Sequence, residues 1–395
     1  MMKSLQILEK AELLLLSFVF LFLPSSILLG ADTPVPPKLS QDRLLEVIRD
    51  GVAWLITHQH PDGGWGSHQT ARPIEVFCTV PGSHNAFRVS TSALAVLALE
   101  DNKMAFPEGR EAASKGIDYL LRAYNVKRVS GEEHYSVWAF GFTLHCFGRW
   151  MKDHPEDPRL PPLTKACEHL MEKLTRYQSL DGGWGYLSIE GLKTYTPAST
   201  SMSFTTATLL VGIDRARSAG IAFPEDRIAR AVASIARTET PTGSFCYGEL
   251  WRKYPLNDIN QVKGSACRTP ACQYALLLFG RDYKEEQRSK ALDDLLETQL
   301  RFQKIGVRRP IPHEAWYSIS GYFYLYGMAY ASYLMETLPE SIRIRYAEPL
   351  FQGVMYCHQP DGSFWDYPLY SYHKPYGTAF ALIALSRVEV PHPDH

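Results

Sequence analysis

Gln59-His-Pro-Asp-Gly-Gly-Trp-Gly66 recurs 119 residues along the chain, counted from position 59 to position 178, as Gln178-Ser-Leu-Asp-Gly-Gly-Trp-Gly185. A third copy, Gln359-Pro-Asp-Gly-Ser-Phe-Trp365, is one residue shorter, and a degenerate copy spans Thr238 to Phe245. These spacings, with Gln299 at a further position, fit a period of about 60 residues. The sequence therefore predicts an array of roughly six such repeats.

Each repeat is predicted to hold one outer and one inner helix. Before the first copy, apolar residues recur at offsets of three and four from Leu44 to Leu55, which indicates a helix with one buried face. Charged residues such as Glu46 and Arg49 cover the rest of that helix, so we expect it in an outer layer. The Asp-Gly-Gly turn should end it, because glycine tolerates the left-handed conformation that closes a helix. Later stretches such as Ser92–Leu99 are apolar on nearly all sides and should form a buried inner layer.

The last repeat favours closure of these layers into a ring. Its apolar stretch is complete and runs to Leu385, whereas an open stack would need polar capping repeats at its ends. No run of alternating β-branched residues competes with the helical pattern. We therefore predict an all-α fold, an α/α toroid of six helix pairs in two concentric layers, over residues 41–388, with residues 389–395 as a tail.

The repeated pattern Gln-x-x-x-Gly-x-Trp, at residues 59–65 and 178–184, is similar to the QW repeat of squalene and oxidosqualene cyclases. Residues from about 40 to 388 resemble the α/α toroid that those cyclases share with the protein prenyltransferase β subunits. The resemblance implies that the Gln and Trp of the repeat tie consecutive helix pairs together. It also implies a ligand inside the ring.

Four catalytic signatures of this superfamily are absent from the sequence. The nearest string to the Asp-x-Asp-Asp of hopene-forming cyclases is Ala291-Leu-Asp-Asp294, which lacks the first Asp. No Cys follows an Asp, as in oxidosqualene cyclases, and no Cys has an Asp two residues before it, as in the zinc site of the prenyltransferases. No Cys follows a Gly, as in the thioester of the related complement proteins. The resemblance therefore implies the fold and leaves the reaction open.

The composition excludes one class of partner. Lys and Arg number 41 against 42 Asp and Glu, and no basic run is present, so nucleic acid is not expected to bind. Seven Cys form an odd set without any Cys-x-x-Cys, which allows one or two disulfides after export but does not predict their pairing.

The N-terminus predicts export. Leu13–Leu29 is almost wholly apolar, and Leu29-Gly-Ala31 offers a small-residue cleavage site, so residues 1–31 resemble a secretory signal peptide followed by a Pro-rich linker, 32–40. The alternative is an uncleaved membrane anchor at residues 13–29, which would be the chain's sole contact with a membrane. The expected location is periplasmic or extracellular.

Function is expected where the loops after the Gly turns meet the starts of the inner helices, at one mouth of the ring. His there could serve acid–base chemistry, and a neighbouring carboxylate could fix its tautomer. The candidate catalytic residues are His134, His313, Glu314 and His373. The candidate ligand-binding residues are His84, Arg88, Tyr135, Trp138, Arg268, Trp316, Tyr317, Tyr322 and Tyr376. The competing interpretation of each is helix capping or core packing.

Neither a metal nor a cofactor is predicted. His134, His313, His373 and Glu314 have suitable chemistry for zinc, but their spacing does not require it. Tyrosines at near-four-residue steps from Tyr322 to Tyr333 could form an aromatic cavity wall, which would suit a prenyl chain, a carbocation or a sugar face.

Three functions remain open from the sequence. The first is an exported toroid protein that acts on or binds a terpenoid or other apolar ligand in its central cavity. The second is a binding or assembly protein that has the ring without the chemistry. The third is a polysaccharide lyase or hydrolase that uses His, Arg and Tyr at the mouth, with a glycan as its ligand. An apolar, aromatic cavity wall would favour the first, and a solvated wall of Arg, His and Tyr would favour the third.

Overall fold

The computed structural model describes residues 38–69, 81–126, 135–185, 200–305 and 323–390 of the 395-residue chain. They belong to one compact unit, Lys38–His395. The predicted signal peptide lies outside these ranges and stays a prediction. Within them the secondary structure is helical, and β structure is limited to isolated bridges such as the one between Met202 and Gly248.

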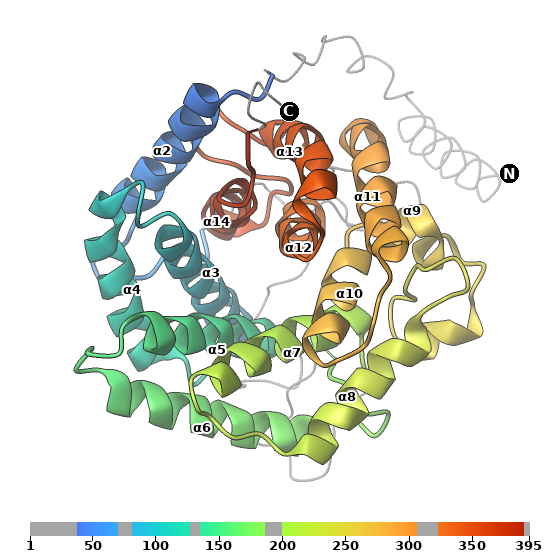
Figure 1. Ribbon diagram of the computed structural model, residues 1–395. Coiled ribbons are helices and arrows are strands. Elements are labelled where there is room, and N and C mark those ends of the chain that lie inside the picture. The colour runs from blue at the N-terminus through green and yellow to red at the C-terminus, as the bar shows by residue number, and fades with distance from the viewer. Residues whose placement is uncertain (1–37, 70–80, 127–134, 186–199, 306–322, 391–395) are drawn as a thin grey trace, which may run out of the picture. The chain divides into compact units, whose positions relative to one another are not determined.

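The inner layer is a ring of buried helices (Figure 1). Each inner helix packs on the next, and the last contacts the first. Their faces are apolar nearly all round, as the sequence predicted, because both the neighbouring inner helices and the outer layer cover them. In chain order they are α3 (Pro81–Asp101), α5 (Ser136–Asp153), α7 (Ser203–Ser218), α10 (Thr269–Leu278), α12 (Tyr324–Glu336) and α14 (His373–Leu385).

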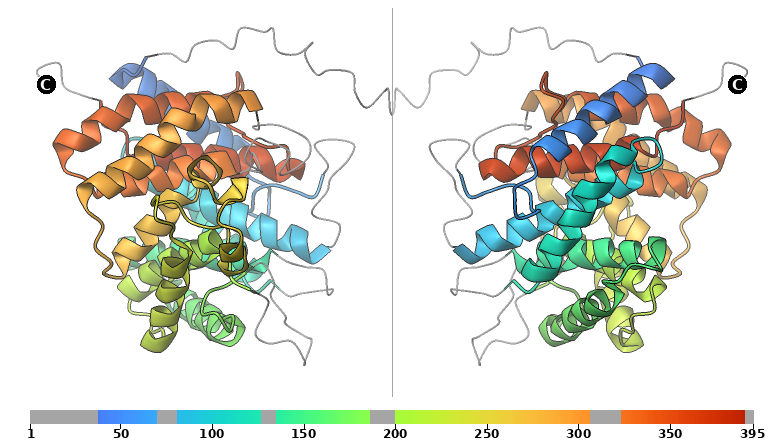
Figure 2. Two further views of the ribbon diagram at one scale, coloured as in Figure 1. Left: turned by 90° about the vertical axis from the view of Figure 1, so that its right-hand side faces the viewer. Right: turned by 90° about the vertical axis from the view of Figure 1, so that its left-hand side faces the viewer.

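The outer helices alternate with the inner ones along the chain. They bury one face and expose the other, and several have charges that favour their ends: α8 has Glu225 and Asp226 in its first turn and Arg237 in its last. Figure 2 shows α2 beside the C-terminal helices, in agreement with its contacts to α14. The outer helices are α2 (Gln41–Thr57), α4 (Arg110–Ala123), α6 (Leu160–Tyr177), α8 (Glu225–Thr238), α11 (Glu285–Ile305) and α13 (Glu340–Met355).

The repeated turn joins one repeat to the next. Gln178 donates from Nε2 to the carbonyl of Gly182 within its own turn, at 2.6 Å, and to the carbonyl of Arg227 in α8, at 2.8 Å. Gln59 makes the same pair of bonds to Gly63 and to Ala112 in α4. Each turn therefore docks on the outer helix of the following repeat.

In the third copy of the turn, the residue at the Trp position is not the one that counting from Gln359 predicts. The backbone N–H of Phe364 donates to Oγ1 of Thr378 at 2.9 Å, as that of Trp184 donates to Oγ1 of Thr206 at 2.9 Å. Phe364, rather than Trp365, thus occupies the Trp position of the turn. The side chain of Gln359 bonds only locally in this region, to the carbonyls of Cys357 and His358.

Closure of the ring uses this same joint. A Cβ added to Gly362 would lie 3.0 Å from the carbonyl oxygen of Asp50 in α2, just as one added to Gly182 would lie 2.5 Å from that of Arg230 in α8. The turn of the last repeat therefore packs on the outer helix of the first. The α/α toroid prediction is confirmed.

Short helices fill connections of the ring: the first lies between α3 and α4, and the others lie in segments that precede inner helices. They do not belong to either layer, and some of the segments between them lead into the pocket described below. These short helices are η3 (Pro107–Gly109), η4 (Glu249–Lys253), η5 (Asp258–Asn260), α9 (Val262–Ser265) and η8 (Tyr370–Tyr372).

Candidate functional site

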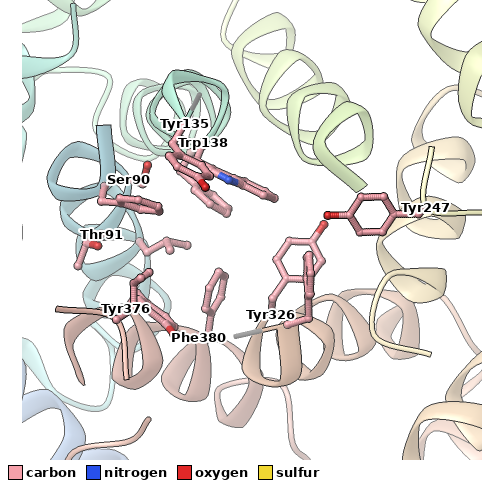
Figure 3. Close-up of a pocket in the computed structure, with 13 residues that line it drawn as sticks. Ser90, Thr91, Tyr135, Trp138, Tyr247, Tyr326, Tyr376 and Phe380 are labelled. Atoms are coloured by element: carbon pink, nitrogen blue, oxygen red, sulfur yellow. The ribbon is translucent and has the colours of Figure 1, made fainter. Parts of the chain in front are cut away.

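An aromatic pocket opens inside the ring, at the end where the inner helices begin (Figure 3). Its space, including the solvent at its mouth, is about 930 Å³. The walls come from α3, α5, α12 and α14, mostly from the parts near their N-termini, and from two connecting segments. The residues that line it are Phe87, Ser90, Thr91, Leu94, Tyr135, Trp138, Phe142, Tyr247, Phe323, Tyr326, Leu369, Tyr376 and Phe380.

The rings of this wall pack on one another across helices. Trp138 and Phe142 of α5 are stacked at 6.0 Å between ring centroids, and Phe142 meets Phe380 of α14 edge-on at 5.8 Å. Tyr326 of α12 contacts Trp138 at 6.1 Å and Phe380 at 6.0 Å. Four side chains from three helices thus make a continuous aromatic surface around the centre of the ring.

A buried carboxyl group stands behind one side of the pocket. Asp366 is fully buried and accepts hydrogen bonds from the hydroxyl of Tyr376, at 2.9 Å, and from the backbone N–H of Leu325 at the start of α12, at 2.9 Å. Burial raises the pKa of Asp366 to about 6, although these donors and the N–H of Tyr367 oppose the rise. Tyr376, which lines the pocket, is therefore hydrogen-bonded to a carboxyl group whose pKa is raised.

The hydroxyl of Tyr326 has its hydrogen-bond partners within the protein. It is bonded to Oγ1 of Thr208 in α7 at 3.0 Å, and it donates to the carbonyl of Phe204 at 3.3 Å. Burial raises the pKa of Tyr326 well above its usual value. Its ring faces the pocket while its polar atom is satisfied in the protein, so this residue presents an apolar surface.

Three residues that the sequence singled out for ligand binding line this pocket: Tyr135, Trp138 and Tyr376. Arg268 does not. Its buried guanidinium donates to the carbonyls of Phe245, at 2.9 Å, and Gly264, at 2.9 Å, and also to that of Ile259. Burial lowers the pKa of Arg268 to about 10. These bonds hold the segment before α10 in place, which gives Arg268 a structural role.

His84 and Arg88 also lie apart from the pocket residues. The Nη2 of Arg88 forms an ion pair of 2.8 Å with Asp62 in the first turn, and its Nε donates to the carbonyl of Gly66 at 3.1 Å. His84 lies 3.2 Å, through its Nδ1, from the hydroxyl of Tyr372. Both residues thus join the first repeat to its own turn or to the last repeat.

His373 begins α14 but serves the turn before that helix. Its Nδ1 bonds to the carbonyl of Tyr370, and its ring meets Trp365 edge-on at 5.4 Å between centroids. Tyr370 has a positive φ of 46°, which is costly for a residue with a side chain, so the bond from His373 stabilises a strained turn. The remaining candidates lie outside the described residues: His134, His313, Glu314, Trp316, Tyr317 and Tyr322.

Asp366 was not among the site residues predicted from the sequence, although its position in the repeat could have indicated it. Once Phe364 is placed at the Trp position of the turn, Asp366 falls two residues beyond it, in the segment that leads to the mouth of the ring.

Among the described residues, no group of three or more His, Cys, Asp or Glu is arranged to hold a metal ion. No described helix is long and apolar enough to cross a membrane. The described cysteines are buried free thiols, so none of them forms a disulfide.

Comparison with known proteins supports the fold. Human lanosterol synthase is 24% identical over 231 residues, which are 53% of this chain and 30% of that enzyme, so the chain spans less than a third of its relative. No family model matches.

Two solved structures show the same arrangement of helices. The structure of D-mannose isomerase matches with a TM-score of 0.56 and 13% identity, over 88% of this chain and 97% of that one. The α-1,6-mannanase GH76A of Salegentibacter sp. HEL1_6, in complex with α-1,6-mannotetrose, matches with a TM-score of 0.55 and 11% identity, over 87% and 98%. The chain thus has an α/α toroid fold, which it shares with an α-1,6-mannanase and a D-mannose isomerase, and part of its sequence is similar to a lanosterol synthase.

Proposed function

We propose that the protein binds a terpenoid-type ligand, an isoprenoid chain or a fused-ring hydrocarbon, in the aromatic pocket. The observation that carries this proposal is the pocket wall, where the rings of Trp138, Phe142, Tyr326 and Phe380 are exposed to the ligand space. Burial of apolar surface contributes about 25 cal/mol per Å², so such a wall favours a large apolar ligand. A sugar would leave its hydroxyls without enough partners there.

The polar groups of the wall refine the ligand class. Ser90 donates its hydroxyl to the carbonyl of Ala86 at 2.7 Å, and Tyr326 is satisfied by Thr208, so neither requires a ligand. Tyr376 donates its hydroxyl to Asp366, and burial raises the pKa of Tyr376 well above its usual value, so this hydroxyl keeps its proton and presents its oxygen to the pocket as a hydrogen-bonding group. We infer that the ligand places one oxygen beside Tyr376.

Export belongs to the same proposal. It rests on the apolar stretch Leu13–Leu29 and on the cleavage site that ends at Ala31. N-terminal sequencing of the protein from its native host should find a chain that begins near Asp32. An N-terminus at Met1 would mean that the segment is retained.

Equilibrium dialysis of the full chain tests the ligand class. Radiolabelled farnesol, which has one hydroxyl, should bind more tightly than squalene, which has none. Phe380→Ala should weaken the binding of both by about tenfold or more, because a buried ring contributes roughly 1.5–3 kcal/mol. Leu256→Ala is the matched control, since Leu256 is 87% exposed and should not change binding.

A glycan ligand is the second candidate. A flat aromatic face such as that of Trp138 can stack on a sugar ring, and glycan-acting enzymes share this fold. α-1,6-Mannotriose is therefore included as a third probe. Saturable binding of mannotriose, with none of farnesol or squalene, would contradict the terpenoid proposal and support this one.

A further inference from the structure

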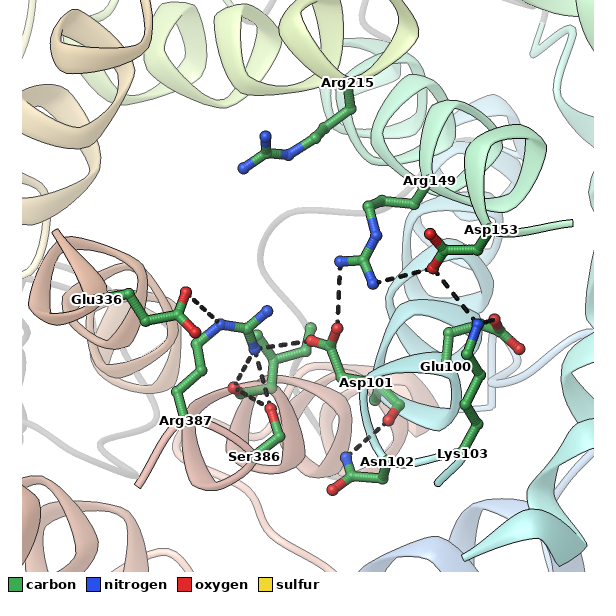
Figure 4. Close-up of polar contacts among 12 residues, drawn as sticks. Glu100, Asp101, Asn102, Lys103, Arg149, Asp153, Arg215, Glu336, Ser386 and Arg387 are labelled. Atoms are coloured by element: carbon green, nitrogen blue, oxygen red, sulfur yellow. Dashed lines mark hydrogen bonds and ion pairs between the residues drawn. The ribbon is translucent and has the colours of Figure 1, made fainter. Parts of the chain in front are cut away.

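A second cluster of polar side chains lies inside the ring, at the end where the inner helices finish (Figure 4). Arg149 is in the last turns of α5, Arg215 is in those of α7, and Arg387 follows α14. The aromatic pocket lies toward the opposite ends of α5 and α14, with Trp138 of α5 in its wall. At 1.5 Å per residue, Trp138 and Arg149 are roughly 16 Å apart along that helix.

Two buried polar atoms in this region have no hydrogen-bond partner among the described residues: Nε2 of His145 and the hydroxyl of Tyr333. Their rings are neighbours, with centroids 6.0 Å apart, and the residues are 4% and 5% exposed. A buried polar atom that lacks a partner is costly, and in native proteins such atoms usually bind water, an ion or a ligand. Two such atoms on neighbouring side chains therefore indicate that water, an ion or a ligand binds here.

The surroundings of His145 indicate the charge of that occupant. Burial lowers the pKa of His145 well below its usual value, and the next three causes are Arg215, Arg149 and Arg387. No carboxylate is among these causes. The imidazole is thus neutral, and it faces a positive field from three helices.

One carboxylate of the cluster, Asp101, lies near Tyr333: burial raises the pKa of that tyrosine, and Asp101 adds to the rise. Asp101 pairs with Arg387 at 2.7 Å and with Arg149 at 3.2 Å. The further carboxylates in ion pairs with the three arginines are Glu336, Asp153 and Asp214. In Figure 4 the side chains of the three arginines nevertheless point toward the interior of the ring. The acids hold the guanidinium groups in place there.

We propose that this end of the ring holds a second binding site, for a small oxyanion, in which Arg149, Arg215 and Arg387 surround the free Nε2 of His145 and the free hydroxyl of Tyr333. Guanidinium groups suit the oxygens of phosphate or carboxylate, and the hydroxyl and the imidazole N–H add two more donors.

The two sites are separate. Tyr330, which is 3% exposed, lies between them: its ring is 4.6 Å from that of Tyr326 in the pocket wall and 6.0 Å from that of Tyr333. Its hydroxyl donates to Thr208 at 3.4 Å. The site therefore takes its own ligand rather than the polar end of the ligand in the aromatic pocket.

Isothermal titration calorimetry of the full chain, at constant ionic strength, tests the site with inorganic phosphate and with acetate. We expect saturable binding of at least one of them, and the stronger identifies the class. Arg215→Gln should weaken it at least tenfold. Arg176→Gln is the control, because Arg176 packs over Tyr177 on an outer helix and should bind as wild type.

Tyr333→Phe distinguishes a role of the Tyr333 hydroxyl in anion binding from a role in stability. It retains the ring and removes the unpartnered hydroxyl, so the ligand-free variant should melt at the same or a higher temperature than wild type, while its affinity for the anion falls about fivefold. Unchanged affinity in both Tyr333→Phe and Arg215→Gln would overturn the proposal. So would the absence of saturable binding of phosphate and of acetate to the wild-type chain.

Discussion

The hydroxyl of Tyr376 donates a 2.9 Å hydrogen bond to Oδ1 of Asp366, and this bond connects the wall of the aromatic pocket to a fully buried carboxyl group. The same carboxyl accepts from the N–H of Leu325, so it also ties the start of α12 to the last repeat. Asp366 thus combines a structural contact with a raised pKa beside the proposed ligand. Its substitution can separate these two effects.

Asp366→Asn should change how stability depends on pH. The pKa of Asp366 in the folded chain is about 6, above the ordinary value of 3.8, so between these values the folded protein retains a proton that the unfolded chain has lost. Unfolding free energy therefore falls as pH rises through this window and is constant above it. The shift of about two units corresponds to about 3 kcal/mol, which Asp366→Asn should remove from the difference between pH 4 and pH 7.

Urea unfolding at pH 4 and pH 7, followed by circular dichroism, measures this difference. Asp294→Asn is the control, because Asp294 pairs with Lys290 on the outer helix α11 and should leave the wild-type dependence in place. If Asp366→Asn and wild type lost the same free energy between the two pH values, the carboxyl would not be titrating near pH 6.

Gly182→Ala should destabilise the protein more than Gly220→Ala. Both glycines have a positive φ, 100° and 91°, so alanine is strained at either position by about 1–2 kcal/mol. An added Cβ at Gly182 would also lie 2.5 Å from the carbonyl oxygen of Arg230, whereas at Gly220 it would meet nothing within 4 Å. The contact should cost about 1–3 kcal/mol more. Equal melting temperatures would show that the turn does not dock tightly on α8.

The fold could be predicted because its repeat depends on short-range chemistry. The turn needs glycine at a positive φ, as at Gly63 and Gly182, and a Gln that reaches the next outer helix, and both appear in the sequence at fixed spacing. The alternation of amphipathic and apolar helices follows from the same period. These signals require no knowledge of which distant residues meet.

The site was only partly predictable, because its parts come from different repeats. Tyr135, Trp138 and Tyr376 were identified from their place near the starts of inner helices, and they line the pocket. Asp366 was missed because the third copy was aligned on Gln359, which displaced the register by one residue. Its contact with Leu325 joins two repeats and leaves no local pattern in the sequence.

His373→Ala should reduce stability without affecting the pocket. The sequence hypothesis expected a loss of ligand binding, but in the structure His373 bonds to the carbonyl of Tyr370 and contacts Trp365. Loss of that hydrogen bond should cost about 1 kcal/mol, and the affinity for farnesol should stay within about twofold of wild type. Dialysis with farnesol and thermal melting of the same sample check both values. A tenfold loss of affinity with an unchanged melting temperature would restore the binding role.

Asp101→Ala should destabilise the seam between the first and last repeats, which is the contact of Asp101 with Arg387. Asp101 ends α3 and Arg387 follows α14, and their ion pair of 2.7 Å is buried, with the side chains 5% and 9% exposed. Asp101→Ala leaves the buried guanidinium of Arg387 with Glu336 as its remaining ion-pair partner, so the cost should approach the ~3–5 kcal/mol of breaking a buried pair. The exposed pair Lys290–Asp294 should lose about 0.5 kcal/mol or less in Asp294→Ala.

A double variant separates the ion pair from the packing at this seam. Asp101→Leu together with Arg387→Met removes both charges, so it should recover much of the stability that Asp101→Ala loses, because the buried guanidinium is removed together with its partner. Arg149 and Glu336 retain other partners in the double variant or reach solvent, since their side chains are 25% and 49% exposed. Urea unfolding of the three variants measures the effect. If the double variant were less stable than Asp101→Ala, the seam would depend on the ion pair itself rather than on avoiding a buried charge.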